Sequence, residues 1–311
     1  MKWSYSKAKT FRQCQRQWFF ANMVANGLAK DPVRRRVYLL GKLQTIAGWR
    51  GSIVDSVIET SVVPALQARD LPDPDTLITR ARRLYDLQLR TAFEHPLRHP
   101  DRTLKSWGEG FAAFYAMEYG DGPSREELDR AWQEIETALR NLCAMRGLLR
   151  RLCAADQLVA QRSLQFQRFG VTVVAVPDLI AFYSDEAPAI LDWKAHVFGT
   201  MDASKQLAIY SIALKSCAPH KDFPASLSRW PVGAIRLVEV QLLLNRFRKH
   251  ELDDADRESV EDHMAESANS ILMAVDGRET ADLVADDFPT ASFDHICERC
   301  SFRKACWETL Q

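Results

Sequence analysis

The sequence predicts an α/β protein in which a central mixed β-sheet is flanked by helices and follows a large N-terminal helical region. Over about the first 150 of its 311 residues, apolar side chains recur at spacings of three and four, which is typical of helices. At about residue 157 the pattern changes to an alternation rich in Val and Phe, which is typical of strands. The order of the two patterns predicts helices first and a sheet after them.

The helical region is divided by prolines at positions 64, 72, 74, 96 and 100. Residues 4–25 form the first predicted helix, because their aromatic and apolar residues have helical spacing and serines are available as caps. The pattern predicts further helices over residues 37–66, 74–92, 104–119 and 124–153.

The sheet region begins with an alternating stretch, residues 157–175, in which Gly170 marks a predicted turn. Strands at 178–184 and 188–194 are joined by "SDEAP" and form a predicted hairpin. The remaining predicted elements are a helix at 202–217, a strand at 233–244, a neighbouring strand in "NRFRKHEL" and a helix that begins near "DDADRESVEDH".

The charges balance overall but are unevenly distributed. Lys plus Arg and Asp plus Glu both number 41, so the net charge of zero gives no hint of a nucleic-acid partner. Residues 1–50 carry eleven basic residues against one acidic residue, whereas residues 251–311 carry five against sixteen. This predicts either an electropositive face that suits a polyanion, or pairing of the two ends with each other. Trp3, Trp18 and Trp49 lie in the basic segment and are candidates for base stacking or for the core.

No segment has the pattern of a signal peptide, and no apolar run reaches the length of a membrane span. We therefore expect a cytoplasmic protein with no membrane partner. Structural disulfides are rare in that compartment, so the seven cysteines need another explanation.

The stretch "VAVPDLIAFYSDEAPAILDWKAH", residues 174–196, contains the first group of candidate site residues. A hairpin around "SDEAP" would bring Asp178 and Asp192 to one edge of the sheet. Two ionised carboxylates that close repel each other unless a divalent cation lies between them, and oxygen ligands favour Mg²⁺ or Mn²⁺. Lys194 shares a strand face with Asp192 and could orient a water or neutralise charge on a phosphate. The alternative is two ordinary strand-end aspartates and a solvated lysine. His196 is either a surface histidine or a contact to a phosphate.

This stretch resembles the signature of the PD-(D/E)XK nuclease superfamily, and "KQLAIYSIAL" resembles the Q-x-x-x-Y helix of its RecB-like branch. The matching residues are Pro177, Asp178, Asp192, Lys194, Gln206 and Tyr210. The resemblance implies a restriction-endonuclease-like core and Mg²⁺- or Mn²⁺-dependent hydrolysis of phosphodiester bonds in DNA. It assigns catalysis to Asp178, Asp192 and Lys194, with Gln206 and Tyr210 orienting the lysine or the substrate.

A further element of the family, G-x-x-x-H-x-x-x-E, corresponds to "GSIVDSVIE", residues 51–59, with Asp55 at the histidine position. A carboxylate also binds Mg²⁺ or Mn²⁺, so the resemblance implies a metal site of Asp55, Asp178, Asp192 and the Trp193 carbonyl. Glu59 is the alternative to Asp55. The departure at Asp55 leaves open a catalytically inactive member of the fold that binds DNA or a protein partner.

The C-terminus contains three cysteines in the pattern C-x2-C-x5-C, which are Cys297, Cys300 and Cys306. Three thiols in ten residues indicate a metal site more readily than disulfides. The fourth ligand is either His295, in a Cys3His zinc site of an interaction module, or Cys14.

The segment "YSKAKTFRQCQRQWFF" resembles the N-terminal helix of the iron–sulfur RecB/AddB-type nucleases, except that Gln15 replaces the usual proline. That resemblance implies a [4Fe–4S] cluster held by Cys14, Cys297, Cys300 and Cys306, with structural Zn²⁺ as the alternative. The whole chain, 1–311, is expected to form one nuclease domain, in which residues 290–311 pack against the helix 4–25.

Residues 60–155 match no family element and are expected to be a helical insertion. The resemblance, which includes CRISPR-associated RecB-like exonucleases, implies an exonuclease that acts on DNA with single-stranded regions in repair, CRISPR adaptation or phage defence. The sequence has no G-x-x-x-x-G-K-(S/T) loop, so a helicase motor would come from a partner.

Overall fold

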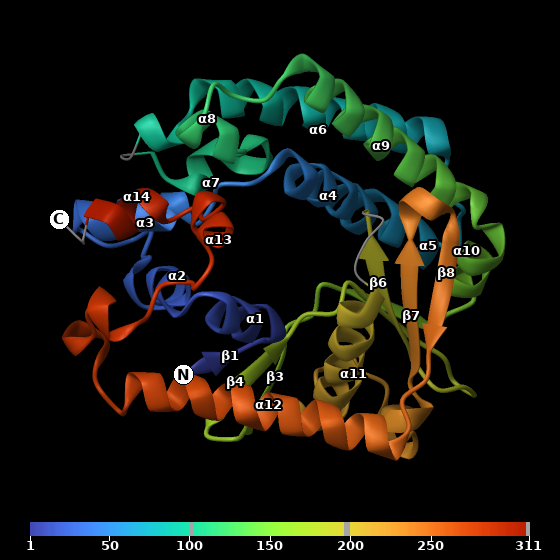
Figure 1. Cartoon of the computed structure of the whole chain (residues 1–311). Helices are drawn as coiled ribbons and strands as arrows, with labels where there is room; N and C mark the ends of the chain where they lie inside the picture. Colours follow the sequence, from blue (N-terminus) through green and yellow to red (C-terminus); the bar gives the residue numbers. More distant parts are fainter. Residues whose placement is uncertain (100–101, 196–199, 309–311) are drawn as a thin grey trace. The chain divides into compact units, whose positions relative to one another are not determined.

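The computed structural model describes residues 1–99, 102–195 and 200–308 (Figure 1). The chain divides into two compact units, and each is built from segments that are far apart in the sequence. Unit 1 contains residues 1–5, 50–83 and 129–265. Unit 2 contains residues 6–49, 84–128 and 266–311.

Unit 1 contains a mixed five-stranded sheet with the order β2-β5-β6-β7-β8, and Figure 1 shows β6 and β7 running in the same direction. The β6–β7 pair is parallel, and the pairs β2–β5, β5–β6 and β7–β8 are antiparallel. The strands in the centre of the sheet are buried on both faces, which explains their nearly continuous apolar sequences. The bounds of the five strands are β2 Gln157–Ala160, β5 Leu179–Phe182, β6 Ala189–Lys194, β7 Arg236–Gln241 and β8 Arg246–His250.

A second, three-stranded sheet in unit 1 has the order β1-β4-β3, with bounds Lys2–Trp3, Val171–Ala175 and Leu164–Arg168. Strands β3 and β4 form the hairpin predicted around Gly170, which has a φ of 73° and therefore the left-handed conformation that glycine tolerates. Strand β1 pairs in parallel with β4. The sequence analysis did not predict β1, because two residues are too few to show a period.

Helix α11, Thr200–Ser216, packs on β6 and β7 and on the second sheet. Its segment 207–214 is buried throughout, so this helix is a core element rather than an amphipathic surface helix. Helices α5 and α10 also lie in unit 1, and four long helices belong partly to each unit. The first two are α5 Val63–Gln67 and α10 Arg146–Cys153. The four long helices are α4 Ile46–Val57, α6 Pro74–Glu94, α9 Arg125–Ala144 and α12 Asp254–Val275.

The prediction of one continuous helix over residues 4–25, most of which lie in unit 2, is wrong. The helix is interrupted at Cys14, whose backbone is extended with φ −159° and ψ 110°. Cys14 then caps the next helix, because its Sγ accepts the backbone N–H of Gln17 at 3.4 Å. Apart from Tyr5, which belongs to unit 1, the helices of unit 2 are α1 Tyr5–Gln13, α2 Gln15–Phe19, α3 Pro32–Leu40, α7 Leu104–Trp107, α8 Tyr115–Tyr119, α13 Asp294–Glu298 and α14 Arg303–Glu308.

Shorter helical turns complete the described chain. Two are π-helical, Phe20–Val24 and Ile58–Val62, and the second directly follows α4. The 3₁₀ turns are Pro96–Arg98, Gly108–Gly110, Ala225–Arg229, Val232–Ala234, Leu242–Leu244, Thr280–Asp282 and Ala285–Asp287. The predicted α/β class, a mixed sheet flanked by helices, is confirmed. Within the described residues, no helix is both long and apolar enough to span a membrane.

Candidate active site

Asp178 and Asp192 meet where the β5–β6 hairpin ends. The last residue pair of the ladder is Leu179 opposite Leu191, so the next position would place Asp178 opposite Asp192. Pro177 has no N–H to continue the ladder. The backbone N–H of Trp193 instead donates to the Asp178 carboxylate at 2.8 Å. The hairpin predicted from the sequence therefore brings the two carboxylates to one place.

Burial and mutual repulsion destabilise the ionised forms of these two carboxylates. Asp192 is 1% exposed, and burial raises its pKa, with Asp178 and the buried Glu239 adding to the effect and Lys194 opposing it. Burial also raises the pKa of Asp178, against the opposing effects of the Trp193 N–H, Lys194 and Gln161. These carboxylates therefore need a positive charge close to them.

Lys194 supplies part of that charge. Its Nζ lies 2.5 Å from Asp192 Oδ2 and donates to Gln206 Oε1 at 3.2 Å. Gln206 Nε2 in turn donates to the hydroxyl of Tyr210 at 2.5 Å, one turn further along α11. The helix face predicted to carry Gln206 and Tyr210 thus contacts the predicted lysine.

Asp55 belongs to the same group of charges. It lies in α4, and its pKa is raised to about 7 by burial and by the charges of Asp178, Asp192 and Glu59, against the opposing effect of Lys194. Glu59, the alternative ligand, is exposed in the π-helical turn. Asp55, which the resemblance implies as a metal ligand, thus interacts electrostatically with Asp178 and Asp192.

Arg50 holds α4 against the end of β6. Its Nη2 donates to the carbonyl of Ala195, the residue after Lys194, at 2.6 Å, and its Nη1 pairs with Glu134. Arg50 is buried, and burial lowers its pKa. The sequence analysis missed this residue. Its signal was a basic residue one position before "GSIVDSVIE", which alone is too weak to interpret.

Glu239 was also missed. It lies on β7 directly beside Asp192 in the parallel register and is 3% exposed. Its carboxylate accepts from Gln241 Nε2 at 2.8 Å and contacts His250 Nε2 at 3.1 Å. The signal was the glutamate inside the apolar run "VGAIRLVEVQLL", which the sequence analysis treated only as a strand.

The donor set suits a hard cation. Asp192 Oδ2 is buried and is paired with the Lys194 ammonium at 2.5 Å. One ammonium beside several buried carboxylates leaves an excess of negative charge, which oxygen-coordinated Mg²⁺ or Mn²⁺ would relieve. Across residues 1–99, 102–195 and 200–308, however, no three His, Cys, Asp or Glu side chains are placed so that they could hold a metal ion as they stand.

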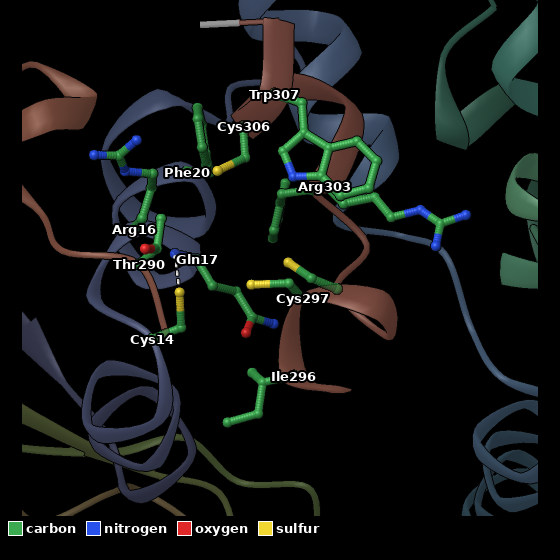
Figure 2. Close-up of a pocket in the computed structure, with 12 residues that line it drawn as sticks. Cys14, Arg16, Gln17, Phe20, Thr290, Ile296, Cys297, Arg303, Cys306 and Trp307 are labelled. Carbon is green, nitrogen blue, oxygen red and sulfur yellow. Dashed lines mark hydrogen bonds between the residues drawn. The ribbon is translucent and has the colours of Figure 1, made fainter. Parts of the chain in front are cut away.

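Unit 2 contains the second candidate site, a cavity lined by all four predicted cysteine ligands (Figure 2). Figure 2 shows Cys14, Cys297 and Cys306 with their sulfur atoms toward the same space. Burial, together with the other three thiols, raises the pKa of Cys300 to about 12. His295 is exposed, and its ring lies 5.7 Å from that of Phe293.

A buried guanidinium completes this cavity. Arg16 lines it, donates to the carbonyl of Phe288 at 2.9 Å and pairs with Asp286 at 3.1 Å. Its Nη1 has no partner among the described residues, and Arg16 lowers the pKa of Cys306 in opposition to burial. The Arg16–Asp286 pair joins the basic N-terminal and acidic C-terminal segments, as one of the two explanations of the charge asymmetry predicts.

Two further predictions can be placed. Trp3, Trp18 and Trp49 are all buried, so they belong to the core and are not available for base stacking. His196, predicted as a surface or phosphate-contacting histidine, lies outside the described residues.

The comparisons with known proteins agree with the geometry of the carboxylate site. Residues 2–307 match the family model for the PD-(D/E)XK nuclease superfamily, so nearly the whole chain is covered. A search of curated proteins gives no significant match.

Proposed function

From the membership of the chain in the PD-(D/E)XK nuclease superfamily, we propose that it is a metal-dependent deoxyribonuclease that hydrolyses phosphodiester bonds. The main support is the convergence of three residues at the end of the hairpin. Asp178 and Asp192 lie one position beyond the last residue pair of the β5–β6 ladder, and Lys194 Nζ is 2.5 Å from Asp192 Oδ2.

Asp178 and Asp192 would hold Mg²⁺ or Mn²⁺, with Asp55 and the Trp193 carbonyl as further ligands. When bound, such an ion acidifies a water molecule and polarises the phosphate. Lys194 is fixed between Asp192 and Gln206 and holds its ammonium where it can donate to the attacking water or to a phosphate oxygen. Gln206, itself held by Tyr210, positions the lysine.

We further propose that the chain belongs to the RecB-like branch and is an exonuclease acting on DNA with single-stranded regions. The Lys194–Gln206–Tyr210 contacts support this placement, because they join the D-x-K strand to the Q-x-x-x-Y helix. Repair, CRISPR adaptation or phage defence would be its setting, with a helicase or another protein as partner.

For the cysteine cavity we propose a [4Fe–4S] cluster bound by Cys14, Cys297, Cys300 and Cys306. The presence of Cys14 in the lining supports this set over a Cys3His zinc site, because His295 is exposed and does not line the cavity. The unpartnered Arg16 Nη1 also suits an anionic group of thiolates and sulfides. Structural Zn²⁺ bound by the four cysteines is the alternative.

The nuclease assignment is tested with end-labelled single- and double-stranded DNA in the presence of Mg²⁺ or Mn²⁺. Lys194→Ala and Asp192→Ala should each reduce cleavage by at least about 100-fold, because they remove transition-state stabilisation or a metal ligand. Lys205→Ala is the matched control, since Lys205 is an exposed lysine beside Gln206 on α11. Undiminished cleavage by folded Asp192→Ala protein would show that the assignment is wrong.

The second candidate is a catalytically inactive member of the fold that binds DNA or a partner. Asp55, at the position of the family histidine, is the observation that favours it. The same assay separates the two functions, because an inactive member would bind the labelled DNA and leave it intact with either metal.

A further inference from the structure

The three neighbouring strands β6, β7 and β8 carry two rows of polar side chains on one face of the sheet. Residues that pair across neighbouring strands point to the same face. One row runs from Lys194 through Gln241 to Arg246. The other row runs from Asp192 through Glu239 to Arg248. Both rows therefore begin at the candidate catalytic residues and end in an arginine on β8.

A chain of hydrogen bonds holds the first of these arginines. Arg246 Nε donates to Gln241 Oε1 at 2.6 Å, and Gln241 Nε2 donates to Glu239 Oε1 at 2.8 Å. Glu239 and Gln241 are each 3% exposed, and His250 contacts the second Glu239 oxygen at 3.1 Å. Because a buried amide fixes its position, Arg246 has lost part of the conformational freedom of an ordinary surface arginine.

The ends of the two rows are accessible. Strand β8 is the last strand of the five-stranded sheet, and Arg246 and Arg248 are exposed. Neighbouring strands lie about 4.8 Å apart, so the β8 backbone lies about 10 Å from that of β6. The Arg246 side chain reaches back from β8 to β7, since its Nε donates to Gln241 Oε1. This separation suits phosphates one or two nucleotides from a phosphate bound at Asp192.

We infer that Arg246 and Arg248 bind backbone phosphates of the DNA strand one to two nucleotides from the scissile bond. The substrate strand then passes the end of β7, whose Glu239 and Gln241 are buried, and leaves the site over the edge strand β8. This inference rests on the proposed nuclease function, since it takes the carboxylates of β6 as the place of cleavage. The arginines would contribute binding and register, whereas the chemistry belongs to Lys194 and the aspartates.

The same strand provides a matched control. Lys249 lies between Arg248 and His250 and points to the other face, where it lines a cavity of about 730 Å³ with Leu191 and Val238. It is exposed and carries the same charge as Arg248. Lys249→Ala therefore removes one positive charge from β8 without touching the two rows.

The experiment measures binding of a fluorescent single-stranded oligonucleotide by anisotropy, over a range of salt concentrations. The Lys194→Ala protein is the parent, so that cleavage does not interfere. Adding Arg248→Ala should weaken binding about tenfold and reduce the slope of log affinity against log salt by about one. Arg246→Ala should act similarly, and Lys249→Ala should change affinity less than about threefold.

Oligonucleotides with a single neutral methylphosphonate then locate the contact. Neutralising the phosphate that Arg248 binds should weaken binding to the parent but not to the Arg248→Ala protein. If Lys249→Ala weakens binding as much as Arg248→Ala, or no single phosphate is coupled to either arginine, the inference is overturned. Equal thermal midpoints of parent and variants exclude unfolding as the cause.

The nuclease proposal fails separately. If wild-type protein leaves DNA intact with both metals while the arginine–phosphate coupling persists, only the proposed cleavage is wrong. If cleavage occurs but the coupling is absent, only the strand path is wrong. If the parent protein binds no oligonucleotide at any salt concentration, the strand path is wrong as well.

Discussion

At the scale of single residues, the candidate site is built from groups that oppose folding. Asp192 is almost fully buried, and burial raises the pKa values of Asp178, Asp192 and Asp55. A raised carboxyl pKa means that the folded chain binds protons more tightly than the unfolded chain does. Its free energy of unfolding therefore falls as the pH rises through the folded-state pKa. Such a cost is usual where a site is arranged for binding rather than for stability.

Asp55→Asn tests this cost. The pKa of Asp55 is raised from 3.8 to about 7, so the destabilisation is absent near pH 4 and complete above about pH 7. The amide should therefore stabilise the protein by about 1 to 3 kcal/mol at pH 8 and have little effect at pH 4.5. Thermal or urea unfolding at the two pH values measures the difference.

Asp73→Asn is the control for that comparison. Asp73 is exposed, and hydrogen bonds from Thr76 lower its pKa, so its substitution should give no stabilisation at pH 8. An Asp55→Asn effect of the same size at both pH values would mean that the buried charge is not its cause.

At the scale of elements, the site depends on how α4 and β6 are joined. Strand β6 carries Asp192 and Lys194, while α4 carries Asp55. Arg50, on α4, donates to the Ala195 carbonyl just after β6 and also pairs with Glu134 on α9. A buried arginine with two acceptors fixes both elements at once, because its planar fork leaves little freedom.

Arg50→Ala should lower the free energy of unfolding by about 2 to 4 kcal/mol, since it leaves a half-buried carboxylate and a carbonyl without their partner. DNA cleavage should fall as well, because Asp55 and Lys194 lose their common support. Arg50→Lys restores the charge without the fork and should recover only part of both properties. Urea unfolding and the cleavage assay are the measurements.

Arg140→Ala is the comparison, because Arg140 is exposed and pairs with Glu136 at 2.9 Å on the surface of α9. Exposed pairs contribute little. If Arg50→Ala is no more harmful than Arg140→Ala, Arg50 does not position the site.

At the scale of the whole molecule, each unit contains one of the two candidate sites. Unit 1 contains the carboxylates, Lys194 and α11, and unit 2 contains the four cysteines. Each unit is assembled from three separate segments of the chain, so a bound group in unit 2 would join segments about 280 residues apart. Such long-range closure restricts the unfolded chain, by about 5 kcal/mol on the loop-entropy account.

Cys14→Ser tests the cluster. Anaerobically purified protein should be brown, and the variant should lose its visible absorption, most of its iron and several degrees of thermal stability. Cys217→Ser should keep all three, because Cys217 is a half-buried cysteine of unit 1 that does not line the cavity. A colourless wild-type protein that contains zinc would contradict the cluster and favour the alternative metal.

Local patterns in the sequence determined the order of the secondary-structure elements and several local contacts. Period changes predicted the order of helices and strands, and the turn "SDEAP" predicted the hairpin at whose end Asp178 and Asp192 lie. The spacing of Gln206 and Tyr210 places them on one helix face, since four residues are about one turn, whereas their role at the site came from the family resemblance. In each case the signal and the contact lie within a few residues of each other.

Only the tertiary structure decided the rest. The break of the first helix at Cys14 occurs within a sequence of good helical spacing, which the cap and packing override. Arg50 and Glu239 reach the site through strand order and helix packing, between residues more than 40 positions apart. Sequence periods describe which face of an element is buried, whereas the choice of neighbouring element follows from how all those faces pack together.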